Sequence, residues 1–354
     1  MYDITIIGAG PAGATLARLL GSKYKVLVLD RRELISPREG SFEKCCGGLI
    51  APDAQRMLGK LGLGVPGEVL VGPQLFTVRT IDVQNKMERY YQRHYINIDR
   101  EKFDSWLVSL IPSTVDIRCG VLFKSYEMDG RKIDISFQFD GKRYTEKTKF
   151  LVGADGANSL LRRQLTGSTF QKTYITVQEW FSVKQNQPYY SAIFDNDISD
   201  FYSWSIPKDN FLIVGAAITP KENVSRKFDL LKKRMINLGF ELNESNKKNG
   251  AFLLRPQNAK QIFIGRDNVL LIGEAAGWIS PTSAEGLSYA FRSAIALADS
   301  IDANSESPIS EYHKNTKGLR LNIFQKNLKS PFMYNTLIRK MVMKSGLSSM
   351  SIRK

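Results

Sequence analysis

The stretch from Asp3 to Asp30 reads DITIIGAGPAGATLARLLGSKYKVLVLD and decides the fold. Residues 3–7 are a short β-branched run, and a glycine-rich turn follows at once. Residues 14–20 favour a helix, and residues 25–29 favour a second strand. Strand, glycine turn, helix and strand in this order are typical of a βαβ unit. The beginning of the chain therefore predicts one.

The spacing of the glycines indicates the ligand of this turn. Gly8 allows the tight turn, Gly10 lets the backbone approach a pyrophosphate, and Gly13 lets the helix and strand pack closely. The N-terminus of the helix supplies N–H donors and a partial positive charge for that anion. Asp30, at the end of the second strand, offers a carboxylate to ribose hydroxyls. Together these residues predict the binding of an adenine dinucleotide.

Two later segments resemble motifs of flavoproteins. Residues 153–159 read GADGANS and resemble the "DG" motif of flavin hydroxylases and their relatives. Residues 271–277 read LIGEAAG, followed by Pro281 and residues 285–287, and resemble the motif that holds the ribityl chain and pyrophosphate of FAD. A reductase with separate flavin and nicotinamide domains is disfavoured, because the chain carries a single glycine fingerprint.

On these motifs the chain resembles the geranylgeranyl-reductase-like branch of the FAD-dependent oxidoreductases with the p-hydroxybenzoate hydroxylase fold, from residue 1 to about residue 300. Residues 46–48 (CGG) are similar to a segment that these reductases place over the isoalloxazine ring. Residues 201–208 (FYSWSIPK) are similar to their Y-x-W-x-F-P-K signature, with Ile206 in place of the usual Phe. Glu274 stands where the broad family has Asp, which keeps the carboxylate but lengthens it by a methylene.

The resemblance implies reduction of C=C double bonds in a prenyl (geranylgeranyl-type) lipid by hydride from reduced FAD, with NAD(P)H or another reductant as electron donor. The carbon left behind needs a proton, and Cys46 is the candidate donor because an ordinary thiol is mostly protonated at neutral pH. Tyr202 and Trp204 alternate with serines, so their rings are expected on one side of a strand, as the wall of an apolar cavity. The residues expected to bind the cofactor are Gly8, Gly10, Ala12, Gly13, Asp30, Arg31, Cys46, Gly47, Gly48, Arg100, Val121, Asp155, Gly156, Glu274, Gly277, Gly286 and Leu287.

Two other functions stay open. Residues 202–207 also resemble the W-x-W-x-I-P motif of flavin halogenases, so an FAD-dependent aromatic monooxygenase or halogenase is the first alternative. The second is a non-catalytic, membrane-associated flavoprotein that binds FAD and turns over neither alkenes nor arenes.

The order of the elements predicts an α/β (α+β) protein. We expect a Rossmann-type FAD-binding domain that is interrupted by an antiparallel-sheet substrate domain and followed by a helical tail. The expected FAD-binding domain covers residues 1–70, 92–160 and 255–310, the substrate domain covers 71–91 and 161–254, and the basic tail covers 311–354. Helices are expected over 100–110, 225–240 and 287–301.

Composition narrows the class of protein. The chain has 354 residues, of which 43% are hydrophobic and 24% charged, and this excludes disorder as its main state. Three cysteines give no disulfide framework or zinc spacing, and His94 and His313 stand alone, so we expect no metal site. No apolar run is long enough to span a membrane, and the N-terminus is unlike a signal peptide. We expect a cytoplasmic protein.

Charge is the unusual bulk property. The net charge is +15, and residues 311–354 hold ten Lys or Arg against one acid, Glu311. The same tail carries apolar residues, and a basic amphipathic helix is typical of a membrane-surface element. We therefore expect contact with the cytoplasmic face of a membrane through the tail, and no nucleic-acid partner, because the sequence shows no known nucleic-acid-binding module.

Overall fold

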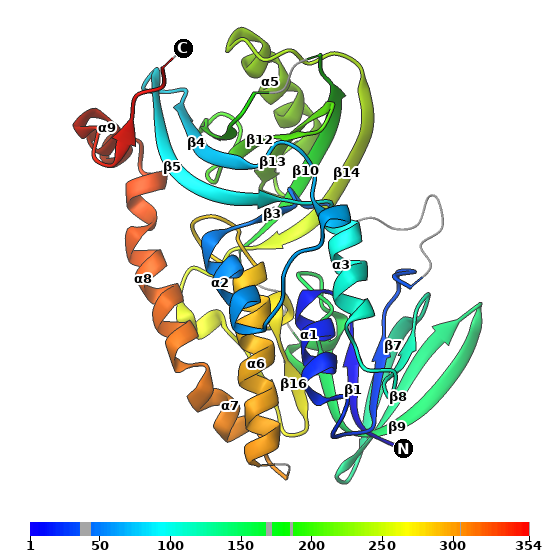
Figure 1. Cartoon of the computed structure of the whole chain (residues 1–354). Helices are drawn as coiled ribbons and strands as arrows, with labels where there is room; N and C mark the ends of the chain where they lie inside the picture. The colour runs from blue at the N-terminus through cyan, green and yellow to red at the C-terminus, as the bar shows by residue number, and fades with distance from the viewer. Residues whose placement is uncertain (36–43, 168–171, 185–186, 305, 354) are drawn as a thin grey trace. The chain divides into compact units, whose positions relative to one another are not determined.

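The structure is a computed structural model that describes residues 1–35, 44–167, 172–184, 187–304 and 306–353. The chain divides into two compact units, each built from three separate segments (Figure 1). Unit 1 contains Met1–Glu43, Glu101–Lys172 and Leu254–Lys326, and unit 2 contains Lys44–Arg100, Thr173–Leu253 and Asn327–Lys354.

Unit 1 is built on a parallel sheet with the strand order β16-β9-β1-β2-β6, and β7 and β8 continue it as an antiparallel meander from β9. Its elements are β1 (Tyr2–Ile7), α1 (Pro11–Leu20), β2 (Val26–Leu29), α3 (Arg100–Ser109), β6 (Asp116–Arg118), β7 (Leu122–Asp129), β8 (Lys132–Phe139), β9 (Lys142–Gly153), α4 (Leu160–Thr166), β15 (Gly265–Arg266), β16 (Val269–Leu271), α6 (Leu287–Ala303) and α7 (Ile309–Asn315). The predicted βαβ unit is β1-α1-β2, and its two strands pair in parallel with Ile4 opposite Val26.

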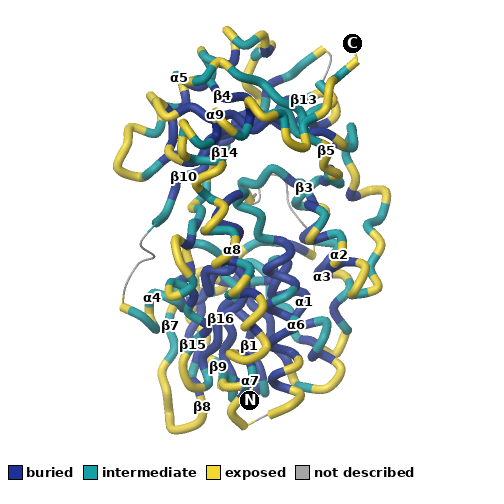
Figure 2. The backbone as a smooth tube through the Cα atoms, turned by 90° about the vertical axis from the view of Figure 1, so that its left-hand side faces the viewer, coloured by how far each residue is buried: buried dark blue, intermediate teal, exposed yellow. Residues whose placement is uncertain are grey.

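The strands of unit 1 are apolar because the sheet is covered on both faces. Ile4, Ile6 and Val28 are completely buried, all of β16 and the last four residues of β9 are buried, and Figure 2 shows the interior of unit 1 in the buried colour. Helices α1 and α6 pack against each other, and the Tyr312 hydroxyl of α7 donates to the Leu271 carbonyl at 3.0 Å. These contacts fix the helix that follows the glycine turn.

Unit 2 is built on a second sheet with the strand order β14-β10-β13-β12-β11-β4-β5-β17. Its elements are β3 (Leu49–Ile50), α2 (Pro52–Lys60), β4 (Leu75–Asp82), β5 (Met87–Asn97), β10 (Thr173–Ser182), β11 (Tyr190–Phe194), β12 (Ser203–Lys208), β13 (Phe211–Ile218), α5 (Val224–Asn237), β14 (Ser245–Leu254), α9 (Thr336–Ser345) and β17 (Ser349–Met350). Helix α8 (Lys317–Tyr334) passes from unit 1 into unit 2.

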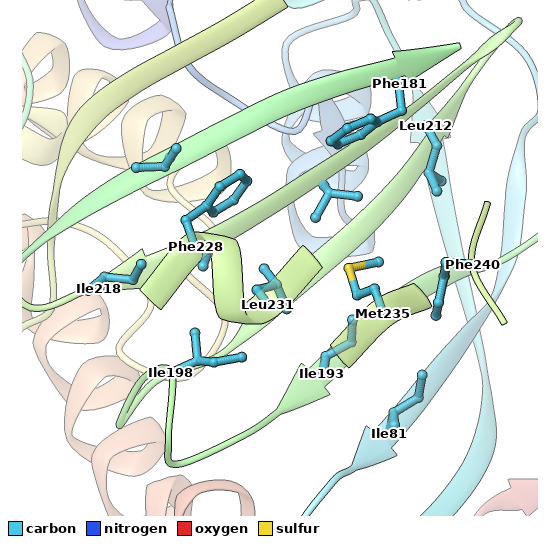
Figure 3. Packing of buried hydrophobic residues seen from close by; sticks show 13 residues of the cluster. Ile81, Phe181, Ile193, Ile198, Leu212, Ile218, Phe228, Leu231, Met235 and Phe240 are labelled. Carbon is cyan, nitrogen blue, oxygen red and sulfur yellow. The ribbon is translucent and has the colours of Figure 1, made fainter. Parts of the chain in front are cut away.

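Helix α5 covers one face of the second sheet. Phe228, Leu231 and Met235 point from the helix onto alternate residues of β10 and β13, such as Phe181 and Leu212 (Figure 3). The next residue along each strand points to the opposite face because side chains alternate across a sheet. We call that opposite face the open face of the sheet, and it carries the residues considered below.

The mixed α/β architecture that the sequence predicts is confirmed, and the division into units differs from the expected boundaries. Residues 44–70 and 92–100 belong to unit 2, since β3 pairs with β5, with Leu49 opposite Asn97. Residues 161–167 belong to unit 1. The tail from 311 onward is no separate body: residues up to 326 pack with unit 1 and residues from 327 pack with unit 2.

Candidate functional site

The carboxyl ends of the parallel strands in unit 1 bring the nucleotide motifs together. The glycine turn follows β1, Asp30 follows β2, Asp155 follows β9 and Glu274 follows β16. These four strands are neighbours and parallel, so the segments that follow them lie along one edge of the sheet. Ligands of open α/β sheets bind at this edge.

The glycine turn is closely packed on the loop after β9. Gly8 has φ +102°, and a Cβ there would lie 2.5 Å from the Ala154 carbonyl oxygen. A Cβ on Gly13 would lie 1.8 Å from the Gly8 carbonyl oxygen, so neither position accepts a side chain. A Cβ on Gly10 would have only the end of the Arg32 side chain within 4 Å. As the N-cap of α1, Gly10 leaves room for a pyrophosphate at the helix N-terminus.

Asp30 supports the turn from the end of β2. One carboxylate oxygen accepts from the Ala9 N–H at 2.6 Å and the other from the Arg32 N–H at 2.8 Å. The Arg32 guanidinium also donates to Asp104 at 2.7 Å, which joins β2 to α3. Val121 is buried beside this turn and donates its N–H to the Asp30 carbonyl, whereas Arg31 is exposed. The expected bond from Asp30 to ribose stays a prediction.

Asp155 has one buried carboxylate oxygen that accepts no hydrogen bond. Its Oδ2 accepts from the Leu160 N–H at 2.9 Å and so caps helix α4. Its Oδ1 is buried and has no hydrogen-bond partner among the described residues. Burial raises the pKa of the carboxyl group above its ordinary value. Gly156 has φ +77°, and a Cβ on it would meet no atom within 4 Å. A ligand hydroxyl or N–H would satisfy the unpaired oxygen, which fits the polar part of FAD.

The segment after β16 closes against the beginning of α1. Gly273 has φ +56°, and a Cβ on it would lie 2.9 Å from the Cβ of Ala12. Glu274 accepts from the Leu254 N–H at 3.2 Å, and Gly277 has φ +91°. Gly286 is the N-cap of α6, whose first residue is Leu287. The unit 1 residues predicted for FAD therefore include the N-caps of α1 and α6, and several of their glycines are in close contact with neighbouring atoms.

In unit 2 the cysteine segment lies against the open face of the sheet. Gly47 faces β12, because a Cβ on Gly47 would lie 2.4 Å from Cδ1 of Ile206. The Cys45 thiol lies 3.4 Å from Oε1 of Gln178 and 3.8 Å from the Thr176 hydroxyl, both on β10. Burial raises the pKa of Cys45 to about 12, so this thiol keeps its proton.

Cys46 is held in a different environment. Arg100 Nη1 lies 3.2 Å from the Cys46 Sγ, and the Gly48 N–H points to the same sulfur at 3.5 Å. Burial raises the pKa of the thiol, but the guanidinium and this N–H outweigh it, so the pKa lies below the ordinary value. From the sequence, Cys46 is expected to have an ordinary thiol pKa. In the structure the thiolate of Cys46 is more favoured than that of an ordinary cysteine, because its pKa is lowered. Arg100, predicted to contact FAD, contacts the thiol of Cys46 in unit 2.

Lys208 completes this cluster and was not singled out from the sequence. Its ammonium is buried and donates to the carbonyls of Ile98 at 2.6 Å and Gly48 at 3.0 Å. Burial lowers the pKa of Lys208 to about 7. Gly48 has φ +59°, and a Cβ on it would lie 2.7 Å from the ammonium. Lys208 is the last residue of the FYSWSIPK segment, so its place in that signature could have marked it as a site residue from the sequence.

Tyr202 and Trp204 do face the same side, with ring centroids 5.6 Å apart. Each is buried, and the Trp204 indole lies over Gly215, where a Cβ would come within 2.4 Å of it. The Phe201 ring contacts both Tyr202 and Tyr334 of α8. The rings thus form a packed aromatic cluster on the open face, and their role as a cavity wall stays a prediction.

No metal centre emerges from the residues that the structure describes: no three of their His, Cys, Asp and Glu side chains are grouped to hold an ion.

Comparisons with known proteins place the chain in a family. A family model described as an FAD binding domain matches residues 81–237. Protein CbrA of Escherichia coli O9:H4 (strain HS) is 42% identical over 347 residues, which cover 98% of this chain and 94% of CbrA. A solved geranylgeranyl bacteriochlorophyll reductase-like protein from Thermoplasma acidophilum superposes with a TM-score of 0.80 at 18% identity, over 97% of this chain and 90% of that one.

A triple mutant of the flavin-dependent brominase Bmp2 superposes with a TM-score of 0.72 at 20% identity, over 98% of this chain and 94% of that one. At such identities the two solved structures demonstrate a shared fold.

Proposed function

This chain belongs to the CbrA family and to the FAD-dependent oxidoreductases, and from that premise we propose that it reduces C=C double bonds of a prenyl, geranylgeranyl-type lipid. The observation that carries the proposal is the Cys46 cluster. A thiol, a guanidinium and a buried amine lie together on the open face of the unit 2 sheet, and strand β12 carries both this amine and the ring of Trp204 on that face. Alkene reduction requires a proton source beside apolar surface, and this cluster contains both.

Bound FAD, once reduced, would supply the hydride. Gly10 and the N-terminus of α1 would bind the pyrophosphate, Asp30 would accept from the ribose, and Asp155 and Glu274 would accept from the ribityl side. Close glycine contacts at Gly8 and Gly13 fix the backbone of this cradle. NAD(P)H is the proposed electron donor, consistent with the family resemblance.

Cys46 is the proposed proton donor to the carbon that becomes electron-rich. Arg100 makes Cys46 a stronger acid than an ordinary thiol, which speeds proton transfer but reduces the fraction that carries a proton. Lys208, with its pKa about 7, is half protonated near neutral pH and can share the role. The two candidate donors can be distinguished by the pH dependence of turnover in variants that lack Cys46 or Lys208.

The reaction is tested by incubating a geranylgeranyl lipid anaerobically with the dithionite-reduced protein and measuring the product by mass spectrometry. The expected result is a gain of hydrogen pairs. Cys46→Ala should lose most of the turnover while its flavin absorbance stays normal, and Cys45→Ala is the matched control with little effect. No gain of hydrogen while the flavin stays reduced contradicts the proposal.

Oxygen chemistry is the second candidate, because the fold is shared with a flavin-dependent brominase and residues 202–207 resemble a halogenase motif. The same assay in air distinguishes the two. Substrate-coupled oxygen consumption with an added oxygen or halogen would favour a monooxygenase or halogenase over the reductase. Unchanged substrates of both kinds would favour a flavoprotein without this catalysis.

A further inference from the structure

The end of the chain exposes apolar side chains on helices that are otherwise basic. Leu328 and Phe332 of α8 are 61% and 54% exposed, and Leu337 and Met341 of α9 are 73% and 64% exposed. Apolar residues scattered singly on a surface need no explanation, but four at helical spacings on two successive helices do. We define the tail surface as these four residues and three exposed lysines of the same two helices, Lys329, Lys340 and Lys344.

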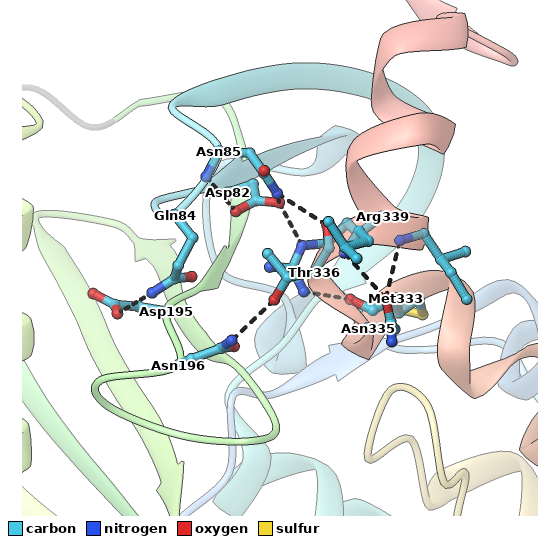
Figure 4. A network of polar contacts seen from close by, with 11 residues as sticks. Asp82, Gln84, Asn85, Asp195, Asn196, Met333, Asn335, Thr336 and Arg339 are labelled. Atoms are coloured by element: carbon cyan, nitrogen blue, oxygen red, sulfur yellow. Dashed lines mark hydrogen bonds and ion pairs between the residues drawn. The ribbon is translucent and has the colours of Figure 1, made fainter.

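Helix α9 is fixed in unit 2 by its other side. Arg339 and Met343, one turn apart, are buried, and Arg339 Nε donates to the buried Asp82 carboxylate at 2.6 Å (Figure 4). Asn85 donates to the same carboxylate and to the Thr336 carbonyl, and Asn335 caps the helix. The packing of α9 is therefore satisfied without Leu337 and Met341, and those two side chains are left for another partner.

The positive charge of the tail favours an anionic partner. Residues 312–354 contain no Asp or Glu, so the lysines of the tail surface have no acidic neighbours along the chain. A second copy of this chain would bring cations against cations, and a neutral protein groove would leave the lysines uncompensated. In the part of the chain that the structure describes, no helix is both long and apolar enough to cross a membrane.

We propose that the tail surface docks on an anionic lipid bilayer, with the lysines at the headgroups and the four apolar side chains at the acyl boundary. Apolar insertion and electrostatic attraction add in such interfacial helices. This inference is independent of the proposed reaction, since docking is measured without substrate. Together the two would place a lipid-reducing enzyme at the surface that holds its substrate.

The test is flotation of the FAD-loaded protein with vesicles of phosphatidylcholine alone or of phosphatidylcholine mixed with phosphatidylglycerol. We expect binding to the mixed vesicles only, weakened by added salt. The variant K340Q/K344Q should bind about 25-fold more weakly, from about fivefold per lysine. The matched control K132Q/K142Q removes the same charge from two exposed lysines of unit 1 and should bind like the wild type.

The apolar half is tested separately with L337N/M341N, for which we expect a loss of about tenfold or more. Folding of every variant is checked by its thermal melt and flavin content. Equal losses in K340Q/K344Q and K132Q/K142Q, or no binding by the wild type, overturn the proposal. A dimer that only the tail variants lose, or duplex DNA that displaces the vesicles, would assign the surface to a second copy or to nucleic acid and overturn it as well.

Discussion

Cys46 is half-buried and Lys208 is buried in unit 2, and the neighbours of each explain why its pKa departs from the ordinary value. The guanidinium of Arg100 and one N–H favour the charged form of the thiol despite its burial. The two carbonyls that accept from Lys208 do not compensate for the burial of its ammonium. The cluster therefore holds its protons less tightly than free side chains would.

The protonation of Cys46 gives the first prediction. The difference in absorbance at the thiolate band between the wild type and Cys46→Ala, followed against pH, should have a midpoint below that of an ordinary thiol. Arg100→Met should raise this midpoint, because the guanidinium that opposes the effect of burial is then gone and only the weaker opposition from the Gly48 N–H and Lys44 remains. Cys45→Ala should leave the midpoint in place. A wild-type midpoint at or above the ordinary thiol value would contradict the assignment.

The second prediction concerns Lys208 and stability. Its folded pKa of about 7 lies below that of an unfolded lysine, so between these values the unfolded state binds more protons and stability rises with pH. Well below pH 7 the buried Lys208 ammonium is fully charged, and its whole cost in folding free energy is present. The free energy of unfolding of the wild type, minus that of Lys208→Met, should increase by about 1.4 kcal/mol per pH unit between about pH 7.5 and 9.

Denaturant titrations at several pH values measure this difference. Lys132→Met is the control, since it replaces an exposed lysine and should show no such slope. A difference that stays flat over this range would mean that the ammonium of Lys208 is not desolvated in solution.

At the level of elements, the turn between β1 and α1 depends on the absence of a single methyl group. Gly13→Ala would place a Cβ 1.8 Å from the Gly8 carbonyl oxygen, so we expect a protein that melts earlier and purifies without flavin. Gly59→Ala in α2 meets no atom within 4 Å and should stabilise by about 0.5–1 kcal/mol. Flavin absorbance per chain and thermal melts measure both. Normal flavin content in Gly13→Ala would refute the tight turn.

The attachment of α9 is the second prediction at this scale. Arg339→Met leaves the Asp82 carboxylate buried and unpaired, so we expect a loss of about 3–5 kcal/mol. Adding Asp82→Asn should restore part of it, because the buried charge is then gone. Burial raises the pKa of Asp82, but the bonds from Arg339 and Asn85 outweigh it and leave the pKa below its ordinary value. The stabilisation that the Asp82–Arg339 ion pair gives the wild type is therefore lost as the pH falls through the pKa of Asp82 in the folded state. Urea titrations of the single and double variants decide the matter.

Sequence patterns predicted the elements better than the contacts between them. The glycine turn and the helix over 287–301 are local patterns, and the structure contains both of them. The Arg339–Asp82 pair joins residues that are 257 positions apart, and no local pattern encodes that pairing. Arg100 likewise resembled a flavin contact by motif, whereas its contact with Cys46 depends on how β5 pairs with β3.

At the level of the whole molecule, the two units carry different parts of the proposed activity. Unit 1 holds the FAD motifs, and unit 2 has its own core under α5. We therefore expect FAD added to the stripped protein to slow hydrogen exchange most at residues 8–20, 153–161 and 273–278. Exchange around Phe228 and Leu231 should change much less. Equal protection of both regions, measured by mass spectrometry, would contradict this localisation.

Each unit draws on the beginning, the middle and the end of the chain, and this has a consequence for biosynthesis. Unit 1 lacks a segment until Lys326 has left the ribosome, and unit 2 lacks one until the last residues emerge. Contacts that are distant in sequence form slowly, and incomplete domains expose apolar surface and unpaired strand edges. The nascent protein should therefore depend on chaperones until residues 327–354 have emerged, and a ribosome stalled before Lys326 should release a chain that aggregates.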